Sequence, residues 1–220
     1  MKFFSLAILF CFFLNFSIGN SLTMRCYYSM QSWYETNGEE YQCMVINDEI
    51  FDGNRVTIKK AEGNHESGKT DDDVKFFYIS SVNLKYFPRN LENVFKNLEL
   101  IFLFKSSLIE ITSVDLKPFP KLKHFQLAAN PIEVIREDLF IHNPELEVFV
   151  LFGNKISHID PKALSHLNNL RAVYFFDNVC EFSNHGAETR SGVLEIVKQI
   201  EQGQCQNPKY TTTTENPFSP

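Results

Sequence analysis

One segment of the sequence matches the phosphate-binding motif G-x-x-x-x-G-K-T, with Gly63, Gly68, Lys69 and Thr70 at its fixed positions. In nucleotide hydrolases this motif holds phosphate because a helix begins at the lysine and points its backbone N–H groups at the ligand. Here three aspartates follow directly, then a strand-like run, and three carboxylates would repel a triphosphate. We therefore interpret the segment as a solvated loop and expect no nucleotide and no cofactor. Calcium is the alternative ligand, but the aspartates lack the spacing of a calcium-binding loop.

Catalytic residues are not visible in the sequence. Its six histidines are scattered, and it has neither the H-E-x-x-H motif of zinc proteases nor the G-x-S-x-G motif of serine hydrolases. His65 stands beside Glu66 in the polar loop, and we expect it at the loop surface. His142, His158 and His166 fall between the predicted strands, where contact with solvent is expected. The sequence thus predicts that the protein is not an enzyme and has no metal site, with a hydrolase built from non-contiguous residues as the weaker alternative.

Residues 1–19 form a predicted signal peptide, which predicts a secreted, extracellular protein. One lysine precedes an apolar run, and Ser17 and Gly19 are small residues at the offsets that a signal peptidase requires. A membrane anchor is the alternative, but the apolar run is too short to span a bilayer. Cleavage removes Cys11 and leaves four cysteines, an even number that implies two disulfides in a secreted chain. A zinc site is disfavoured because no two of them form a close C-x-x-C pair.

The composition is that of one folded domain. Of the 220 residues, 44% are apolar and 22% are charged, which is enough apolar material for a sizeable core. Loss of Lys2 with the signal peptide leaves 20 basic against 27 acidic residues, a net charge of −7. Such a surface repels nucleic acid and anionic lipid. No segment after the signal peptide is apolar for long enough to span a membrane, so neither nucleic acid nor a membrane is an expected partner.

The elements that must position any site come from a repeat of 24 residues, which recurs five times without drift. The third and fourth units read LKHFQLAANPI and LEVFVLFGNKI, and they match the leucine-rich repeat template L-x-x-L-x-L-x-x-N-x-L with Phe at the fourth place. Four successive units also carry an apolar residue thirteen places after their first: Phe87, Ile111, Ile135 and Ile159. The five units start at Val74, Leu98, Leu122, Leu146 and Leu170. This regularity predicts a solenoid of stacked coils.

On these motifs, the cysteine-bounded body of the chain resembles the extracellular leucine-rich repeat family, and in particular its small secreted members from insects. The resemblance implies an α/β solenoid with short parallel strands on its concave side, irregular or short-helical segments on its convex side, and disulfide-capped ends. It also implies a role in recognition, with innate immunity, cell adhesion and matrix as settings consistent with the family.

The template assigns a direction to each side chain of the repeat. Residues at places 4 and 6 share one face of a short strand and point into the coil, so places 3, 5 and 7 point outward. The asparagine at place 9 (Asn130, Asn154, Asn178) lies where the chain turns off the strand, and a buried amide there can bond otherwise unpaired backbone groups. Val82 and Ser106 replace it in the first two units, so this ladder should weaken toward the N-terminal side.

Both ends of a solenoid need caps, because an uncovered coil exposes apolar side chains and strand edges. We predict an N-terminal cap hairpin at 20–52 and repeats over 53–180. A C-terminal helical cap follows over 181–206, and a disordered tail rich in Thr and Pro covers 207–220.

The N-terminal cap is predicted to be a hairpin that a disulfide between Cys26 and Cys43 closes. Aromatic-rich runs surround both cysteines, and Asn37 and Gly38 form a hairpin-turn dipeptide between them. Residues 54–60 then read as the strand of an irregular first coil, with alternate apolar residues inward.

The C-terminal cap is predicted to be an amphipathic helix over 188–202, fastened by a disulfide between Cys180 and Cys205. Gly203 suits the end of that helix. The two pairings follow because the solenoid axis keeps the N-terminal cysteines away from the C-terminal ones. The apolar residues that would cover the last coil are Val193, Ile196, Val197 and Ile200.

Apolar and aromatic residues dominate the outward places of the strands, although the surface of a solenoid strand should be mixed and polar. Five coils about 4.8 Å apart give a strip of roughly 300 to 400 Å², which is about the largest patch of a typical monomer. A full interface buries roughly 800 Å² per partner, so neighbouring loops or a second copy must contribute. The predicted partner-binding residues are Phe76, Tyr78, Leu100, Phe102, Phe104, His124, Gln126, Val148, Val150, Phe152, Tyr174 and Phe176.

Three interpretations of this strip stay open at the level of sequence. The first is an extracellular binding module that holds a protein partner against the strip. The second is a self-associating structural protein that dimerises through it. In the third, the aromatic side chains only stack across strands and stabilise the sheet. Under the first two, Phe102 and Phe152 both face solvent, while Phe149 points into the core.

Overall fold

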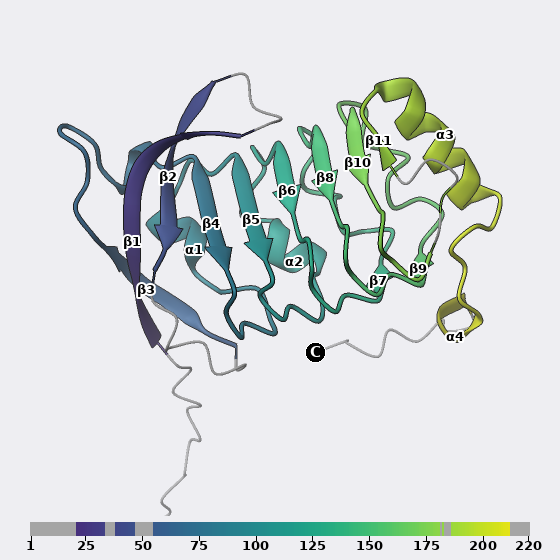
Figure 1. Ribbon diagram of the computed structural model, residues 1–220, viewed down its shortest axis with the longest axis horizontal. Coiled ribbons are helices and arrows are strands. Elements are labelled where there is room, and N and C mark those ends of the chain that lie inside the picture. Colours follow the sequence, from purple (N-terminus) through teal and green to yellow (C-terminus); the bar gives the residue numbers. More distant parts are fainter. Residues whose placement is uncertain (1–20, 34–37, 47–54, 181, 183–185, 212–220) are drawn as a thin grey trace, which may run out of the picture.

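The computed structural model describes the chain over residues 21–33, 38–46, 55–180, 182 and 186–211. The predicted signal peptide lies outside these residues. Each repeat contributes one strand to a continuous parallel sheet along the molecule (Figure 1). These strands are β4 (Phe76–Ser80), β5 (Leu100–Phe104), β6 (His124–Gln126), β8 (Val148–Val150) and β10 (Ala172–Tyr174).

The register of the sheet follows the repeat. Phe76 pairs with Leu100, which pairs with His124, and the same row continues through Val148 to Ala172. Equivalent places of successive coils therefore lie side by side. The predicted leucine-rich repeat solenoid with a parallel concave sheet is confirmed.

The inward places of the repeats fill one continuous core that extends from the first cap to the last. Phe149 is an example at place 4, with 0% of its surface exposed. Its ring stacks on Phe125 at 6.0 Å and packs edge-on against Phe140 at 4.7 Å. Because each coil buries its aromatic residues against the next coil, no single repeat would be stable alone.

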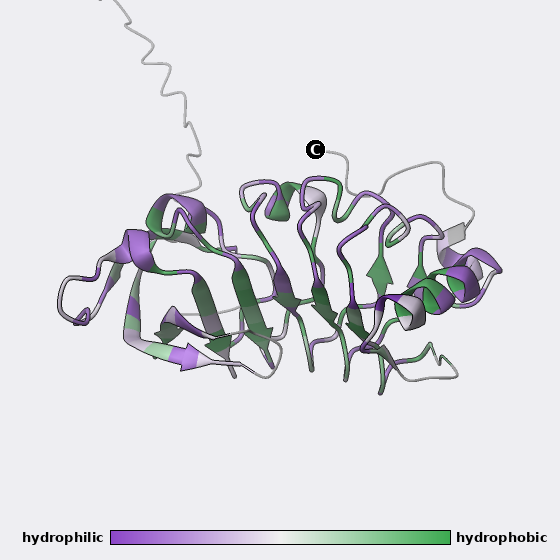
Figure 2. Ribbon diagram, turned by 90° about the horizontal axis from the view of Figure 1, so that it is seen from above, coloured by the Kyte–Doolittle hydropathy of each residue, from purple (hydrophilic) through white to green (hydrophobic). Residues whose placement is uncertain are grey.

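The convex side consists of turns and short elements. They are α1 (Leu91–Val94), α2 (Ser113–Leu116), and the pair β7 (Val134–Ile135) and β9 (His158–Ile159). Viewed from above, the hydrophobic strands of the sheet lie on one side and these polar turns on the other (Figure 2). This arrangement leaves the outward faces of the strands uncovered by helices.

The N-terminal cap is an antiparallel hairpin of β1 (Ser21–Ser32) and β2 (Glu39–Val45). A disulfide joins Cys26 to Cys43, as predicted. β2 pairs in parallel with β4 and so attaches the hairpin to the first repeat. Asn37 of the predicted turn lies outside the described residues.

The strand expected in an irregular first coil takes another place. β3 (Thr57–Glu62) pairs in parallel with β1 at the outer edge of the sheet, whereas β2 occupies the position beside β4. Val56 and Ile58 still point into the core, each 1% exposed. The physical reason is the 12-residue length of β1, whose free edge would otherwise expose a long row of unpaired backbone groups.

The loop with the phosphate-binding motif is not followed by a long helix. Its last residues form a single 3-10 turn, η1 (Asp71–Asp73), and β4 comes next. The Lys69 ammonium lies 3.7 Å from the Asp73 carboxylate and 5.5 Å from the centre of the Tyr41 ring. The charge that would hold a phosphate is thus paired within the loop.

The sequence predicts His65 at the loop surface. In the structure His65 packs against the hairpin instead. Its ring stacks on Tyr28 at 3.8 Å, and its Nδ1 lies 3.1 Å from the Tyr41 hydroxyl. The Tyr28 hydroxyl donates to the Asp71 carboxylate at 2.6 Å. Burial raises the pKa of Tyr28 above its ordinary value, and the bond to Asp71 raises it further. The sequence expectation fails because the aromatic face of the hairpin offers the imidazole a stacking partner.

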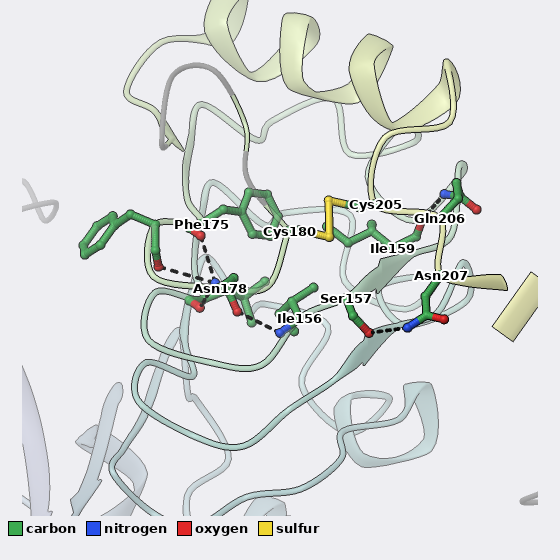
Figure 3. Close-up of a disulfide and its surroundings, with 11 residues drawn as sticks. Ile156, Ser157, Ile159, Phe175, Asn178, Cys180, Cys205, Gln206 and Asn207 are labelled. Atoms are coloured by element: carbon green, nitrogen blue, oxygen red, sulfur yellow. Dashed lines mark hydrogen bonds between the residues drawn. A yellow bond between two sulfur atoms is a disulfide. The ribbon is translucent and has the colours of Figure 1, made fainter. Parts of the chain in front are cut away.

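The C-terminal cap consists of β11 (Gly186–Ala187), which pairs with β10, and α3 (Arg190–Glu201). The four apolar residues predicted to face the last coil are all buried in α3. Thr189 caps the helix by accepting a bond from the Gly192 amide at 3.2 Å. The Cys180–Cys205 disulfide is present, as predicted (Figure 3). The sheet order is β11-β10-β8-β6-β5-β4-β2-β1-β3.

The segment after α3 returns to the convex side of the fourth coil. The Gln206 side chain donates to the Ile159 carbonyl at 2.6 Å, and the Asn207 side chain donates to the Ser157 hydroxyl at 3.1 Å (Figure 3). The short helix α4 (Pro208–Thr211) follows. The predicted boundary of the disordered tail, at residue 207, is therefore too early, because these side-chain amides bond polar groups of the convex side.

His158 is buried beneath this returning segment, whereas the sequence placed it in contact with solvent. It is 1% exposed and lies 2.8 Å from the Asp160 carboxylate. The Tyr210 ring lies 5.7 Å from the imidazole, and its hydroxyl donates to Glu133 at 2.8 Å. A tyrosine from the end of the chain thus covers a histidine of the fourth repeat.

Candidate functional site

A ladder of buried asparagines holds the strands of the C-terminal half in place. The Asn154 amide donates to the carbonyls of Leu127 and Leu151, at 2.9 and 2.8 Å. One carbonyl belongs to its own coil and the other to the preceding coil, so each asparagine joins two coils. Asn130 and Asn178 make the equivalent bonds, the latter visible in Figure 3.

The ladder is weaker at the N-terminal side, as the sequence predicted. Ser106 takes the asparagine place in the second repeat, and its hydroxyl donates only to the Phe104 carbonyl of its own coil, at 3.2 Å. Val82 in the first repeat has no polar side-chain group. The ladder therefore reaches β5 only through Asn130, which donates to the Leu103 carbonyl, and β4 depends on other contacts for its position.

A groove of about 400 Å³ lies on the concave face over β6, β8 and β10. Among the described residues that line it, none is a lysine, arginine, aspartate or glutamate. His124 and Gln126 are its polar side chains, Tyr174 and Trp33 add a hydroxyl and an indole N–H, and the remainder is apolar. The lining residues are Trp33, Phe102, His124, Phe125, Gln126, Val148, Val150, Phe152, Tyr174 and Phe176.

Trp33, just beyond the end of β1, forms the N-terminal wall of the groove. Its ring packs edge-on against Phe102 at 4.9 Å and against Phe76 at 5.5 Å, and lies 5.9 Å from Tyr78. Such edge-to-face arrangements are the favoured geometry of aromatic pairs. With Leu100, these rings form a small apolar cluster separate from the main core.

The opposite wall is a stacked pair, Phe152 and Phe176, with ring centres 4.6 Å apart and planes 5° from parallel. Phe176 is 37% exposed and Phe152 is half-buried. Val150 and Tyr174, on neighbouring strands, lie in register and are also half-buried. The C-terminal half of the concave face thus offers apolar side chains to a ligand.

A row of alternating charges lies at place 2, beside the groove. Glu99 accepts from Lys123 at 2.7 Å and pairs with Lys75 at 3.4 Å, and Glu147 pairs with Arg171 at 3.4 Å. Burial opposes ionisation of Glu99, but its bonds to the lysines outweigh burial and hold its pKa below the usual value. The bond to Glu99 likewise raises the pKa of Lys123. Because these charges are paired, they leave the groove without a strong field of one sign.

The structure divides the predicted strip into two parts. Four of its residues lie outside the groove: Phe76, Tyr78, Leu100 and Phe104. The prediction that Phe102 faces solvent is wrong, since it is 5% exposed, and Phe76 and Leu100 are 0% and 3% exposed. Trp33 covers Phe102 at place 5. Place 3 is buried in both halves, since the groove residues His124 and Val148 are themselves only 6% and 2% exposed. The strip residues that line the groove are Phe102, His124, Gln126, Val148, Val150, Phe152, Tyr174 and Phe176.

Sequence reasoning missed Trp33 and Phe125 as lining residues. Phe125 is an inward residue of the repeat, so its place gives no signal. Trp33 does give a signal, because it is the only tryptophan of the chain and lies in an aromatic-rich run beside the predicted hairpin turn. A large aromatic residue near the tip of a hairpin has to pack against something, and the adjacent concave face is the available surface.

The described part of the chain holds no group of three or more His, Cys, Asp or Glu side chains placed to bind a metal ion. Within the same residues, no helix has both the length and the apolar character needed to cross a membrane.

The match to a family model agrees with the repeat architecture. Residues 120–179 match the family model described as leucine rich repeat. No curated protein sequence matches the chain. A chain in the solved structure of the Toll–Spatzle complex, described as a molecular hub in Drosophila development and innate immunity, is similar with a TM-score of 0.46 and 18% identity. The similarity covers 57% of this chain and only 17% of that one.

Proposed function

We propose that this protein is a secreted recognition module that binds an extracellular protein partner in the groove over β6, β8 and β10. The observation that carries the proposal is the groove itself, a concave apolar surface whose described lining residues include no Lys, Arg, Asp or Glu. Monomeric proteins rarely leave such a surface exposed unless it contacts a partner. Solenoids commonly use their concave faces for this purpose.

The surroundings of the groove favour a macromolecular partner. The whole outward strip covers roughly 300 to 400 Å², which is less than the roughly 800 Å² that a full interface buries per partner. The surface around the groove must therefore take part. The paired charges of Glu99, Lys123, Glu147 and Arg171 each stand one residue before a strand of the concave sheet. A central apolar patch beside paired charges is the usual composition of a protein interface.

Two disulfides support an extracellular location. Cys26–Cys43 and Cys180–Cys205 fasten the two caps, and disulfides of this kind persist in oxidising compartments. The predicted signal peptide is consistent with secretion.

The test is affinity capture from the native extracellular fluid with three immobilised proteins: the wild type, Val150→Asp and Val114→Asp. Val150→Asp places a carboxylate in the groove, whereas Val114 is 76% exposed on the convex side and gives the same change elsewhere. We expect one protein to be retained by the wild type and by Val114→Asp, and lost from Val150→Asp. Equal retention by all three folded proteins would contradict the proposal.

Light scattering on the same three proteins separates a foreign partner from a second copy of this chain. We expect the wild type to be monomeric at micromolar concentration. A stable dimer that only Val150→Asp dissociates would instead identify a second copy as the occupant of the groove, which is the self-associating alternative.

A further inference from the structure

Trp33 shows which kind of side chain the concave face accepts. Its indole lies across the outward rings of β4 and β5, edge-on to Phe76 and Phe102. Under this cover Phe102 is 5% exposed, whereas Gln126, Val150 and Tyr174, at the same place of later coils, are half-buried. One aromatic side chain from the hairpin is therefore enough to bury the outward ring at the centre of β5.

The groove next to Trp33 is the same kind of surface, and among the described residues no second hairpin side chain lines it. Phe102 belongs both to the aromatic cluster under Trp33 and to the groove, since its ring contacts Trp33 and also lines the groove. Val148 continues the row of Leu100 along the sheet, and Val150 continues that of Phe102. A volume of about 400 Å³ is within the range of pockets that bind ligands.

We propose that the groove is a subsite for an aromatic side chain on an uncharged segment of the partner protein. Trp33 and Phe102 form one wall of the subsite, and the Phe152–Phe176 pair forms the other. The inference rests on the proposed function, because it names the chemistry by which the partner is held. A charged side chain is excluded, since it would lose its hydration without meeting an opposite charge.

Trp33 is, in this view, a specificity-determining residue as well as a part of the N-terminal cap. It forms one of the two aromatic walls, and aromatic rings favour edge-on or offset packing against such walls. His124 and Gln126 supply the polar groups of the subsite. A side chain with a flat aromatic body therefore fits better than a branched aliphatic one.

The test uses Trp33 as its own reporter, because it is the only tryptophan of the chain and lines the groove. The probes are the N-acetyl amides of phenylalanine, leucine and aspartic acid, the last with its side-chain carboxylate free. Each is added while Trp33 is excited selectively and its emission is recorded. We expect the phenylalanine probe to change the emission saturably, with a Kd of about 1 mM for so small a ligand. The leucine probe should bind at least ~3-fold more weakly, and the aspartate probe should have no effect.

Two variants locate the binding. Phe152→Ala should weaken the phenylalanine probe at least ~10-fold, because it removes one of the stacked walls. Tyr27→Ala is the control, since Tyr27 is 56% exposed on β1 and does not line the groove. Calorimetry with the same probes gives the affinity independently of the emission. Equal binding of all three probes, or no change in Phe152→Ala, would overturn the inference.

The result of the probe experiment can be distinguished from the result of the capture experiment that tests the proposed function. If partner capture depends on Val150 but the phenylalanine probe does not bind, the aromatic subsite is wrong and the recognition role stands. If the probe binds and Phe152→Ala abolishes its binding while capture ignores Val150→Asp, the subsite stands and the groove does not bind the captured protein.

Discussion

The two halves of the concave face are built from the same repeat but are stabilised in different ways. Over β4 and β5, the asparagine of the template is replaced by Val82 and Ser106, and Trp33 covers the outward rings. Over β6, β8 and β10, buried asparagines bond adjacent coils, and the outward side chains line an open groove.

The difference indicates what keeps a concave face available for binding. Where side-chain amides satisfy the backbone, the outward residues are not needed to hold the coils together, so they can remain open to a ligand. Where the side-chain amides are missing, aromatic packing against the hairpin supplies the stability, and the rings used for that packing are no longer available to a ligand. The following predictions test this contrast, beginning with the largest expected effect.

The largest effect should follow from Phe149→Ala, which tests the alternation that both halves share. Phe149 is 0% exposed between Phe125 and Phe140, so its removal opens a cavity and should lower the free energy of unfolding by about 3 to 5 kcal/mol. Val150→Ala, one residue away on the groove side, should cost at most about 1 kcal/mol. Denaturant titration measures both, and the reverse order would mean that the strand register is shifted by one.

The asparagine ladder is tested by comparing Asn154→Ala with Ser106→Ala. Asn154→Ala removes one of the two amide donors from each of the Leu127 and Leu151 carbonyls, which keep Asn130 and Asn178. It also leaves the Ile132 amide without its side-chain acceptor, and a buried group left unpaired costs about 1 to 3 kcal/mol. We expect a loss of about 2 kcal/mol for Asn154→Ala and at most about 1 kcal/mol for Ser106→Ala, measured by thermal and denaturant unfolding. Equal losses would remove the basis for the contrast between the halves.

The role of Trp33 is tested by Phe102→Ser and Phe152→Ser. Both residues occupy outward places, but Phe102 is buried against Trp33 and Phe76 whereas Phe152 is half-buried. Phe102→Ser should lower stability by about 2 kcal/mol, and Phe152→Ser by at most about 1 kcal/mol while it weakens partner binding. Unfolding curves check the first statement and capture assays the second. If both variants are equally stable, Trp33 does not support the N-terminal half.

The smallest effect concerns alkaline pH and the N-terminal cap. The pKa of Tyr28 is raised in the folded protein, so its contribution to stability is present below its unfolded value of about 10 and is lost as the pH rises above it. Tyr28→Phe should cost about 1 kcal/mol at neutral pH through the lost bond to Asp71, and should reduce the alkaline loss. Hydrogen exchange above pH 10 should show β1 and β2 opening before α3, and simultaneous opening would argue against a separate cap.

Much of the fold could be predicted because its signals are local. The 24-residue spacing gave the strands and their register, and the spacing of Val193, Ile196, Val197 and Ile200 gave the buried face of α3. The cysteine pairs followed from their places at the two ends of the solenoid. In each case the signal lies in the spacing of residues along the chain.

The errors all concern contacts between segments distant in the sequence. β3 lies at the edge of β1 instead of in a first coil, Tyr210 covers His158, and His65 stacks on Tyr28. For the candidate site, the sequence identified most of the lining residues but assumed that the whole strip was exposed. No local pattern reveals that a distant side chain lies over a given surface.

The sequence by itself determined which side chains leave the strands on the concave side, because alternation along a strand has a fixed period of two. The tertiary structure alone decided which of them remain open. Exposure depends on what other segments place over a surface, and here the hairpin carries Trp33 onto the rings of β4 and β5. The location of the groove is therefore a property of the packed cap and repeats together, not of the repeat.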